Sequence, residues 1–347
     1  MKVLIFCVTN SYSGAEKYVH ELALAFRRRN ISVSFIIFPN SKFEEELRDS
    51  DFPIINGYFG SKLGKRTFIK YLFNFHRNRR EISRILESNS DVDLIITQFK
   101  GEQLIIGSLS NRKIFSKIIA IEHGPIPSPL IKIPFIRWKL HQFYSKIGTV
   151  FAVSRVVSES LSSIGIRSKI LPAVSSDNLL EIRGILPIRP TVLFAGRLTR
   201  KKGVKKYVKI AKLNPEVLFH IAGDGPLREW VHKKTKVIKN LVELGFVKNI
   251  KSELENCMAV VILSNEHGEG LPLIATEAIQ SGRHVYISKD SVVAEFLKRE
   301  FTQNVTVFDS RNFNYLHRHL THLTVSNTHR ISPQLANWEE ISRLVLP

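Results

Sequence analysis

The chain has 347 residues, of which 44% are hydrophobic and 10% aromatic, and its formal net charge is +20 at pH 7. This length exceeds the size at which one hydrophobic core stops growing, so it predicts two domains, and the composition excludes an intrinsically disordered protein. The positive charge favours nucleic acid, anionic lipid headgroups or phosphorylated substrates as partners, but it carries no information about the fold.

The N-terminus, MKVLIFCVTN, predicts a first β-strand rather than a secretory signal. Its apolar run ends before Thr9, whereas a secretory core needs roughly 7 to 15 apolar residues and a cleavage site. No window approaches the roughly 18 apolar residues of a membrane span, so we expect a soluble or peripheral protein. Cys7 and Cys257 lie in apolar segments and are expected to be free, buried thiols, which favours a reducing compartment.

Short apolar runs alternate with amphipathic stretches through the first half of the chain. The runs that predict strands buried on both faces are KVLIFCV, VSFIIF, DLIIT, KIIAIEH and TVFAVS. Between the first two, apolar residues at helical spacing predict a helix: Val19, Leu22, Ala23 and Phe26. Alternating strands and helices predict a parallel sheet covered by helices, and we assign residues 1–175 to this domain.

The alternation stops around LPAVSSDNLLEIRGILPIRP, where prolines accumulate, and we place a linker at residues 176–190. It restarts with TVLFAG, VLFHIAG, a weaker NLVELGF, AVVILS and HVYIS, which predict a second α/β domain over residues 191–332. Ser332 and Pro333 are typical of a helix start, so residues 333–347 are expected to form a C-terminal helix.

Ligands of open parallel sheets bind at the carboxyl ends of the strands, so the loops that follow the strands are the candidate sites. Ser13 and Gly14 precede a helix whose amides suit a phosphate, although the glycine could serve only a tight turn. Arg197 and Lys202 follow a strand and pair a guanidinium with an ammonium, which suits a diphosphate. The alternative for this segment is a solvated basic turn. His123 can bond a sugar hydroxyl, although a lone histidine is more often structural.

Asn265 to Ala278, NEHGEGLPLIATEA, carries carboxylates among glycine, proline and small apolar residues. An unpaired buried carboxylate is costly, so hydroxyls or positive charge are expected beside them. A helix starting near Leu271 would have Pro272 in its first turn, with Glu269 in the loop and Glu277 about a turn and a half inside the helix. Two carboxylates separated by helix amides suit the hydroxyls and phosphates of a nucleoside diphosphate sugar.

Glu269 and Glu277 form an E-x7-E pair that resembles the signature of retaining glycosyltransferases of family 4, which have the two-domain GT-B fold. Further segments are similar to the same family, in its order and over nearly the whole chain: SGAEKYVHELA, AGRLTRKKG, AGDGPL, EAIQSGRHVYIS and ANWEEI. The resemblance implies an α/β protein of the GT-B type, with two Rossmann-like domains whose parallel sheets face a central cleft. It also implies that the C-terminal helix packs back on the first domain.

The resemblance implies sugar transfer from a nucleotide-diphosphate sugar. Arg197 and Lys202 would hold the donor diphosphate, and Glu277 would accept from the ribose hydroxyls. Glu269 would hold the donor sugar together with the amides that follow it. The remaining donor-binding residues implied are Ser13 and Gly14 beneath the phosphates, Gly223 on the nucleoside side, and Gly270 and Leu271 after Glu269. His123 would face the transferred sugar.

The mechanism implied is front-face substitution with retention, in which the departing phosphate helps to deprotonate the acceptor. The catalytic residues would be His123, Glu269, Arg197 and Lys202. The two cations would stabilise the leaving diphosphate in place of a metal, so we expect no metal and no cofactor. The string Asp91 to Asp93 matches an aspartate-x-aspartate metal site, but it precedes a strand and is interpreted as a solvated strand start. Ser13 replaces one of the family's paired glycines, which leaves the details of donor contact open.

Basic and aromatic residues interleave in GSKLGKRTFIKYLFNFHRNRREISR, residues 60–84, and in LIKIPFIRWKLHQFYSK. Such clusters are typical of proteins that bind an anionic membrane surface, and the alternative is an amphipathic helix with a solvated basic face. We therefore expect a cytoplasmic enzyme on the inner face of the cell membrane. Its partners would be a UDP- rather than GDP-linked sugar and a glycan, polyprenyl-linked or lipid-linked acceptor.

The function predicted is a hexosyltransferase of bacterial surface polysaccharide or lipopolysaccharide biosynthesis. One alternative is a basic nucleic-acid-binding protein, but no nucleic-acid module is recognised and the basic residues are divided between both halves of the chain, so no nucleic acid is expected. Another alternative is a GT-B protein that acts as a nucleotide-sugar epimerase or as an inactive partner subunit.

Overall fold

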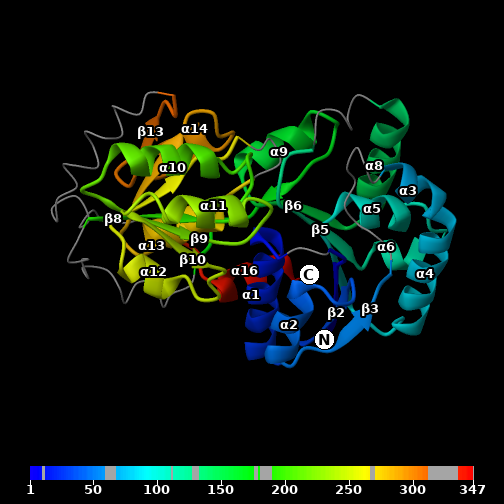
Figure 1. The fold of residues 1–347 in the computed structure, drawn as a ribbon. Helices are drawn as coiled ribbons and strands as arrows, with labels where there is room; N and C mark the ends of the chain where they lie inside the picture. The colour runs from blue at the N-terminus through cyan, green and yellow to red at the C-terminus, as the bar shows by residue number, and fades with distance from the viewer. Residues whose placement is uncertain are drawn as a thin grey trace. The chain divides into compact units, whose positions relative to one another are not determined.

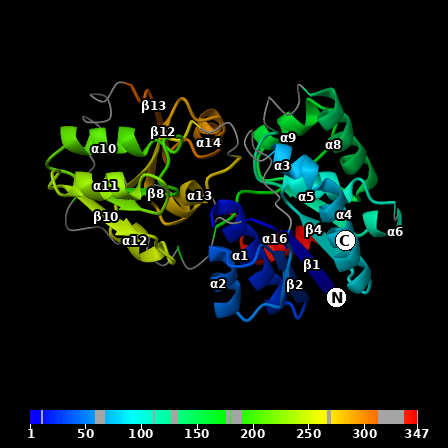
Figure 2. The ribbon, with the colours of Figure 1, turned by 45° about the vertical axis from the view of Figure 1, so that its right-hand side comes forward.

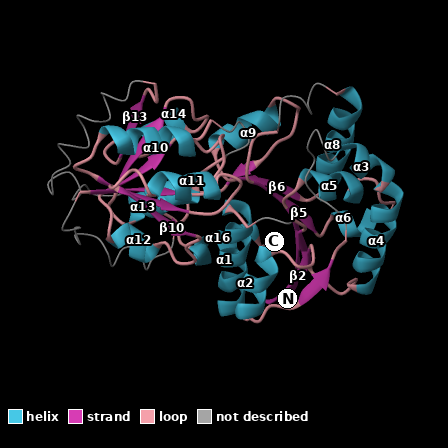
Figure 3. Cartoon of the chain, viewed as in Figure 1, coloured by secondary structure: helices cyan, strands magenta, loops and turns pink. Residues whose placement is uncertain are grey.

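The structure is a computed structural model that describes residues 1–9, 12–58, 68–110, 112–126, 133–175, 179, 190–265, 270–311 and 335–346. The chain divides into two compact units. The N-terminal unit comprises Met1–Pro172 and Trp338–Pro347, and the C-terminal unit comprises Ala173–Asn337. Each unit consists of a sheet and surrounding helices (Figures 1 and 3).

The N-terminal unit contains a seven-stranded parallel sheet in the order β3-β2-β1-β4-β5-β6-β7. Its strands are β1 (Lys2–Cys7), β2 (Ser32–Ile37), β3 (Ile54–Asn56), β4 (Leu94–Thr97), β5 (Ile118–Glu122), β6 (Thr149–Ala152) and β7 (Lys169–Ile170). The chain runs from β1 to β2 and β3 and then continues with β4 on the other side of β1. This reversal is a topological switch point, where open α/β sheets bind ligands.

Helices cover both faces of this sheet (Figures 1 and 2). One face carries α1 (Gly14–Arg28) and α2 (Lys42–Asp49). The other carries α3 (Phe68–Phe73), α4 (Phe75–Ser88), α5 (Lys100–Ile106), α6 (Arg112–Phe115) and α8 (Pro134–Lys146), and α9 (Arg155–Ser162) joins β6 to β7. All residues of β4 and β5 are buried, as strands covered on both faces must be.

The apolar residues that predict the first helix all lie on its buried side: Val19, Leu22, Ala23 and Phe26. They face the sheet because residues three and four apart share one side of a helix. The free, buried state predicted for Cys7 and Cys257 is also confirmed.

The C-terminal helix α16 (Trp338–Val345) belongs to the N-terminal unit and packs against α1. The Trp338 ring meets the ring of Tyr18 edge-on, with 4.9 Å between the ring centroids. Arg28 forms an ion pair with Glu339, and Arg29 donates to the Ser342 hydroxyl over 3.2 Å. Aromatic and charged contacts therefore fix the last helix to the first.

The C-terminal unit contains a six-stranded parallel sheet in the order β10-β9-β8-β11-β12-β13. Its strands are β8 (Thr191–Ala195), β9 (Leu218–Ala222), β10 (Leu241–Gly245), β11 (Ala259–Ile262), β12 (His284–Ser288) and β13 (Val305–Phe308). Its helices are α10 (Val204–Leu213), α11 (Arg228–Thr235), α12 (Lys251–Glu255), α13 (Leu273–Gln280) and α14 (Ala294–Glu300). Figure 2 shows α10 and α11 on one side of this sheet and α13 and α14 on the other.

Three details differ from or refine the sequence predictions. The C-terminal helix predicted over residues 333–347 begins only at Trp338, because the backbone of Ala336 pairs with Val174 in an isolated bridge. The weak strand NLVELGF is formed, as β10 at the edge of the sheet. The predicted helix start near Leu271 is wrong, because α13 begins at Leu273 and Pro272 is its extended N-cap residue, with φ −67° and ψ 118°. The Ala275 amide donates to the Pro272 carbonyl over 2.9 Å, so Glu277 lies about one turn inside the helix. Within the described ranges, no helix combines the length and the apolar character that crossing a membrane requires.

Candidate active site

The cationic turn, Gly196 to Gly203, follows β8 at the carboxyl edge of the C-terminal sheet. Because β8 lies between β9 and β11, this turn is flanked by the loops of both neighbours. The Leu198 amide donates to the Asp224 carbonyl of the β9 loop over 2.9 Å. On the other side, the Asn265 amide donates to the Lys201 carbonyl over 3.0 Å. The structure therefore brings three predicted ligand loops together at one edge of one sheet.

Glycines make this close packing of loops possible. Gly223 has φ +143°, and a Cβ there would lie 1.9 Å from the Gly196 carbonyl oxygen. Gly203 has φ +82°, and a Cβ there would lie 2.4 Å from the Leu263 Cβ. Both φ values lie in the region that side chains disfavour. Gly223, predicted only as a nucleoside contact, is thus also required by the packing of its own loop.

Arg197 and Lys202 come from the two ends of this cationic turn. The Thr199 amide donates to the Arg197 carbonyl over 2.8 Å, and the Lys202 amide donates to the Thr199 hydroxyl over 3.2 Å. The turn is therefore held by its own hydrogen bonds. The Arg197 side chain is exposed and Lys202 is half-buried. A guanidinium and an ammonium held on one short turn are suited to bind a polyphosphate.

The acidic loop after β11 is described only at its ends. Glu269 lies outside the described residues, and its role stays a prediction. Asn265, at the start of the loop, is bonded to the cationic turn, and Gly270 and Leu271 lead from its end into α13. Glu277 is buried on α13, which packs against β11 and β12. The loop thus begins beside the cationic turn and ends at the helix that carries Glu277.

In the N-terminal unit, Ser13 is the N-cap residue of α1 and Gly14 is its first helical residue. The Ser13 hydroxyl donates to a Glu16 carboxylate oxygen over 2.5 Å, so it is turned toward the helix. A Cβ added at Gly14 would meet nothing within 4 Å. Unlike Gly203 and Gly223, Gly14 is not required by packing, and the space beside it is open to a ligand.

His123 directly follows β5, on the same unit as Gly14. Its ring meets the ring of Tyr18 of α1 edge-on, with 5.0 Å between the centroids. The His123 Nε2 and the Tyr18 hydroxyl are both buried and have no hydrogen-bond partner among the described residues. Burial, helped by the positive charge of Lys100, lowers the pKa of His123 to about 3. The imidazole is therefore neutral at physiological pH and has a nitrogen free for a ligand.

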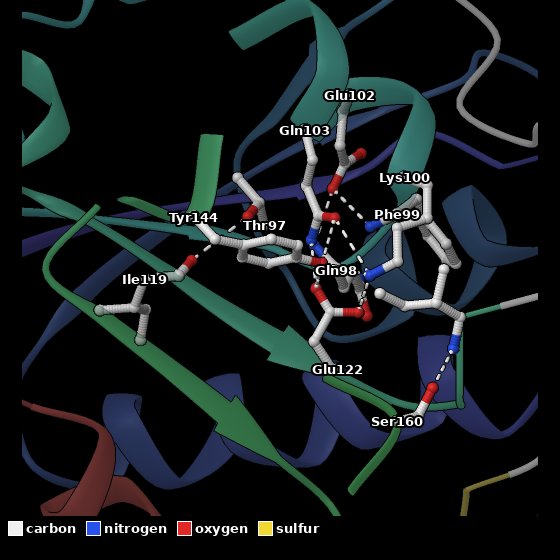
Figure 4. Close-up of polar contacts among 11 residues, drawn as sticks. Thr97, Gln98, Phe99, Lys100, Glu102, Gln103, Ile119, Glu122, Tyr144 and Ser160 are labelled. Atoms are coloured by element: carbon white, nitrogen blue, oxygen red, sulfur yellow. Dashed lines mark hydrogen bonds and ion pairs between the residues drawn. The ribbon is translucent and has the colours of Figure 1, made fainter. Parts of the chain in front are cut away.

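A buried polar cluster that the sequence did not predict lies at the end of β5, where Glu122 directly precedes His123 in the chain (Figure 4). Lys100, at the start of α5, forms an ion pair with Glu122, the last residue of β5. Gln103 Nε2 and the Tyr144 hydroxyl each donate to Glu122 Oε1 over 2.7 Å. No sequence motif marks these residues, because they come from one strand and two helices far apart in the chain.

The aspartate-x-aspartate string lies where the chain enters β4. Asp91 and Asp93 are exposed at the start of β4, where Lys2 forms an ion pair with Asp91. Among the residues that the structure describes, no group of three histidine, cysteine or acidic side chains could hold a metal ion. The interpretation of this string as a solvated strand start is confirmed.

Two family models match the chain. The model described as Glycosyltransferase Family 4 matches residues 12–172, and the model described as Glycosyl transferases group 1 matches residues 177–334. The first match covers the strands of the N-terminal sheet except β1, and the second covers all strands of the C-terminal sheet. A search of curated proteins gave no match.

Solved structures of low sequence identity share the fold. HepE from Anabaena, solved with UDP, is 17% identical with a TM-score of 0.73, covering 99% of this chain and 98% of HepE. The sucrose-phosphate synthase of Thermosynechococcus elongatus is 15% identical with a TM-score of 0.70, covering 99% of this chain and 96% of the synthase. The lipopolysaccharide outer core galactosyltransferase WaaB is 17% identical with a TM-score of 0.62, covering 99% of this chain and 93% of WaaB. The predicted GT-B fold class is confirmed.

Proposed function

Because the chain belongs to the glycosyltransferases of the GT-B, family 4 type, we propose that it is a retaining, metal-independent hexosyltransferase that uses a nucleotide-diphosphate sugar. The observation that carries the proposal is the meeting of the cationic turn and the acidic loop at one edge of the C-terminal sheet. The hydrogen bond from Asn265 to Lys201 joins them. A diphosphate bound by Arg197 and Lys202 would therefore lie at the entrance of the loop that carries Glu269.

In the proposed reaction, negative charge develops on the donor diphosphate beside the cations of Arg197 and Lys202. As the bond to the sugar breaks, negative charge grows on the diphosphate, and preorganised cations stabilise that charge more than they stabilise the bound donor. We assign this contribution to Arg197 and Lys202. Glu269, with the amides of Gly270 and Leu271, is assigned to the donor sugar, and Glu277 to the ribose hydroxyls, because carboxylates accept from hydroxyls.

The N-terminal unit supplies a second group of residues at the carboxyl edge of its sheet. Ser13 and Gly14 are assigned to the phosphates, because the first amides of a helix lack partners within the helix and attract anions. The open space beside Gly14 supports this assignment. His123 is assigned to the transferred sugar, and its buried, unpartnered Nε2 supports that assignment.

We propose that the donor is UDP-linked. The support is a comparison: HepE, which shares the fold, has been solved with UDP and with UDP-glucose. WaaB is a lipopolysaccharide outer core galactosyltransferase, and this supports a glycan or lipid-linked acceptor in polysaccharide or lipopolysaccharide biosynthesis.

We also propose that the enzyme is cytoplasmic and binds the anionic inner face of the cell membrane through α8. Phe135 and Trp138 of this helix are 60% and 52% exposed, and the Lys139 ammonium lies 4.8 Å from the Trp138 ring centroid. Exposed aromatics beside basic residues suit an anionic lipid surface. The other basic and aromatic stretch, residues 60–84, is described only in part, and α3 within it exposes Phe73.

Purified protein should release UDP from UDP-sugars in the presence of an acceptor extract, with and without a chelator. Glu269→Gln and Arg197→Ala should abolish release, whereas Arg228→Ala, an exposed arginine on α11, should not. Turnover at the wild-type rate in both site variants contradicts the site. Turnover that a chelator abolishes contradicts metal independence, and the anomeric configuration of the product tests retention.

Membrane binding is tested separately by flotation with vesicles that contain anionic lipid. The Phe135→Ser/Trp138→Ser variant should lose binding. Phe246→Ser, which removes an exposed aromatic ring of the C-terminal unit, is the matched control and should keep it. Equal binding of wild type and both variants contradicts the role of α8.

A further inference from the structure

A cavity of about 350 Å³ lies in the N-terminal unit, between α4 and the segment that leads from α5 through α6 into β5. Figures 1 and 2 both show α4 and α6 side by side. Three apolar side chains form the floor of the cavity, Leu86 of α4 and Leu109 and Ile114 of the facing segment. Leu86 and Leu109 are themselves buried. A cavity of this size accommodates a small organic ligand.

The cavity lies at the other edge of the sheet from the residues assigned to sugar transfer. The helix α4 leads into the amino end of β4, and α6 leads into the amino end of β5. The Lys117 ammonium joins these two approaches, because it donates to the carbonyl oxygens of Ser90 and Val92 over 3.1 and 2.7 Å. Gly14 and His123, in contrast, follow the carboxyl ends of β1 and β5. The cavity is therefore no part of the proposed active site.

The wall that α4 contributes carries two guanidinium groups. Arg79 is half-buried and Arg80 is exposed, and both line the cavity together with Ser83. Within the described ranges, neither guanidinium forms an ion pair or a hydrogen bond. By contrast, Arg48 and Arg155, on other helices of the same unit, are each paired with a carboxylate one helical turn away.

The carboxylates of α4 do not compensate these two cations. Glu87 lines the cavity, but it follows Arg80 by seven residues, which is about 10 Å along the helix axis. Its Oε1 accepts from the Ser83 hydroxyl over 2.7 Å. Glu81 is nearer in sequence, but its Oε1 accepts from the Tyr58 amide over 2.6 Å. Two positive charges thus share one end of a cavity with an apolar floor.

A phosphate monoester matches this arrangement. Its charge at neutral pH is about −1.5 to −2, so one such group offsets the repulsion between two adjacent cations. A guanidinium donates two parallel hydrogen bonds to a phosphate. Ser110, on the facing wall, offers a hydroxyl as a further donor. The carbon part of the ester would lie on the apolar floor.

We propose that this cavity binds a phosphate monoester group through Arg79 and Arg80, as a second ligand site of the N-terminal unit. The inference goes beyond the proposed function and does not depend on it. It also assigns a role to the basic residues of α4, for which the sequence left membrane contact and a solvated face as alternatives. Two sources carry the group, namely a soluble phosphorylated metabolite and a lipid with a phosphate monoester headgroup.

Calorimetric titration with glycerol phosphate tests the soluble source. The Arg197→Ala/Lys202→Ala background removes binding to the cationic turn, and physiological ionic strength screens the general positive field of the protein. One hydrogen bond to a charged group changes a Kd about 10- to 100-fold. Because Arg79→Gln/Arg80→Gln removes several such bonds, it should raise the Kd for glycerol phosphate about 100-fold or more.

Two further variants separate the cavity from the charge of the helix. Arg77→Gln/Arg84→Gln removes the same charge from exposed positions of α4 that do not line the cavity, so it is the matched control and should keep the wild-type Kd. Glu87→Gln removes the carboxylate from the cavity, so it should lower the Kd about 2- to 5-fold, the usual magnitude for a partly exposed charge pair.

Flotation with phosphatidylcholine vesicles tests the lipid source, in the Phe135→Ser/Trp138→Ser background that removes the proposed contact through α8. The vesicles contain either phosphatidic acid, whose headgroup is a phosphate monoester, or phosphatidylglycerol, whose headgroup is a diester. Binding to the phosphatidic acid vesicles alone, lost in Arg79→Gln/Arg80→Gln, assigns the cavity to a lipid headgroup. Binding of glycerol phosphate in the titration assigns it to a soluble ligand.

Three results overturn the proposal. The first is that the wild-type cavity binds neither glycerol phosphate nor phosphatidic acid vesicles. The second is an equal loss of binding in Arg79→Gln/Arg80→Gln and in Arg77→Gln/Arg84→Gln, which would indicate a solvated basic face. The third is equal binding of both kinds of vesicle without binding of glycerol phosphate. Neither measurement requires turnover, so a protein that binds the ester here but transfers no sugar contradicts only the proposed function.

Discussion

Gly14 is the position at which binding and stability should respond in opposite directions to one methyl group. It is the first residue of α1, and a Cβ there would meet nothing within 4 Å. Gly14→Ala therefore adds no clash in the folded protein. Replacing glycine by alanine at a compatible position reduces the entropy of the unfolded chain and stabilises a protein by about 0.4–1 kcal/mol.

The same methyl group should interfere with a ligand that approaches the first amides of α1. Hydrogen bonds to a charged group contribute about 1.5–3 kcal/mol each. If one such bond to a donor phosphate is lost, the Kd for UDP-sugar should rise about 10- to 100-fold. The melting temperature of the N-terminal unit should meanwhile rise by about 1–4 °C, from the usual shift of about 2–4 °C per kcal/mol for this size.

Calorimetric titration with UDP and UDP-sugar gives the Kd, and a thermal melt without ligand gives the stability. Wild-type affinity in a stabilised Gly14→Ala protein would refute the placement of phosphates beside Gly14. A destabilised Gly14→Ala protein would show instead that the space beside this residue is not open.

Three further predictions concern buried or closely packed residues of the described ranges. Gly223→Ala should destabilise the C-terminal unit by about 2–4 kcal/mol in urea unfolding, because its Cβ would lie 1.9 Å from the Gly196 carbonyl oxygen, and unchanged stability would contradict the packing of these loops. Glu102→Gln should flatten the pH dependence of stability, because burial raises the pKa of the Glu102 carboxyl from 4.5 in the unfolded chain to about 8 in the folded protein. As the pH rises between these two values, the wild type should lose up to about 1.4 kcal/mol of its free energy of unfolding per pH unit, whereas the variant should not. Parallel curves of stability against pH for the two proteins would refute the raised pKa. Arg283→Met should cost about 1–3 kcal/mol in urea unfolding, because the buried guanidinium donates to the Leu254 carbonyl over 2.7 Å, and a neutral substitution would show that this carbonyl finds another donor.

The parallel sheets could be predicted because their strands are buried on both faces. A run such as LIIT has no polar residue to mark a solvent side, and β4 is buried throughout, as the run predicts. The strand β10 gave a weaker signal, because it lies at an edge and most of its residues are only partly buried. The start of helix α13 was predicted two residues too early, because proline is compatible with both the first turn and the N-cap position. The ψ angle of Pro272, which the sequence does not give, shows that it is the N-cap.

The candidate site was predicted as a set of loops, and the structure adds which of them touch. Strand order decides this: β8 lies between β9 and β11, so the cationic turn meets both neighbouring loops. The sequence could not show which glycines are required by close packing and which have open space beside them. Gly14 and Gly223 both follow a strand, yet a Cβ has open space at Gly14 and would strike a carbonyl oxygen at Gly223.

The ion pair of Lys100 and Glu122 escaped prediction for a more general reason. A sequence pattern assigns charged residues to the surface, because an isolated buried charge is costly. It does not reveal that two residues of opposite charge form an ion pair in the folded protein, where their charges compensate each other. Here they meet because β4 and β5 are adjacent and parallel, so the start of the helix after β4 lies beside the carboxyl end of β5. Residues of opposite charge that follow consecutive predicted strands are therefore candidates for a buried ion pair. In this fold such a pair lies at the carboxyl ends of the strands, which is where open parallel sheets bind ligands.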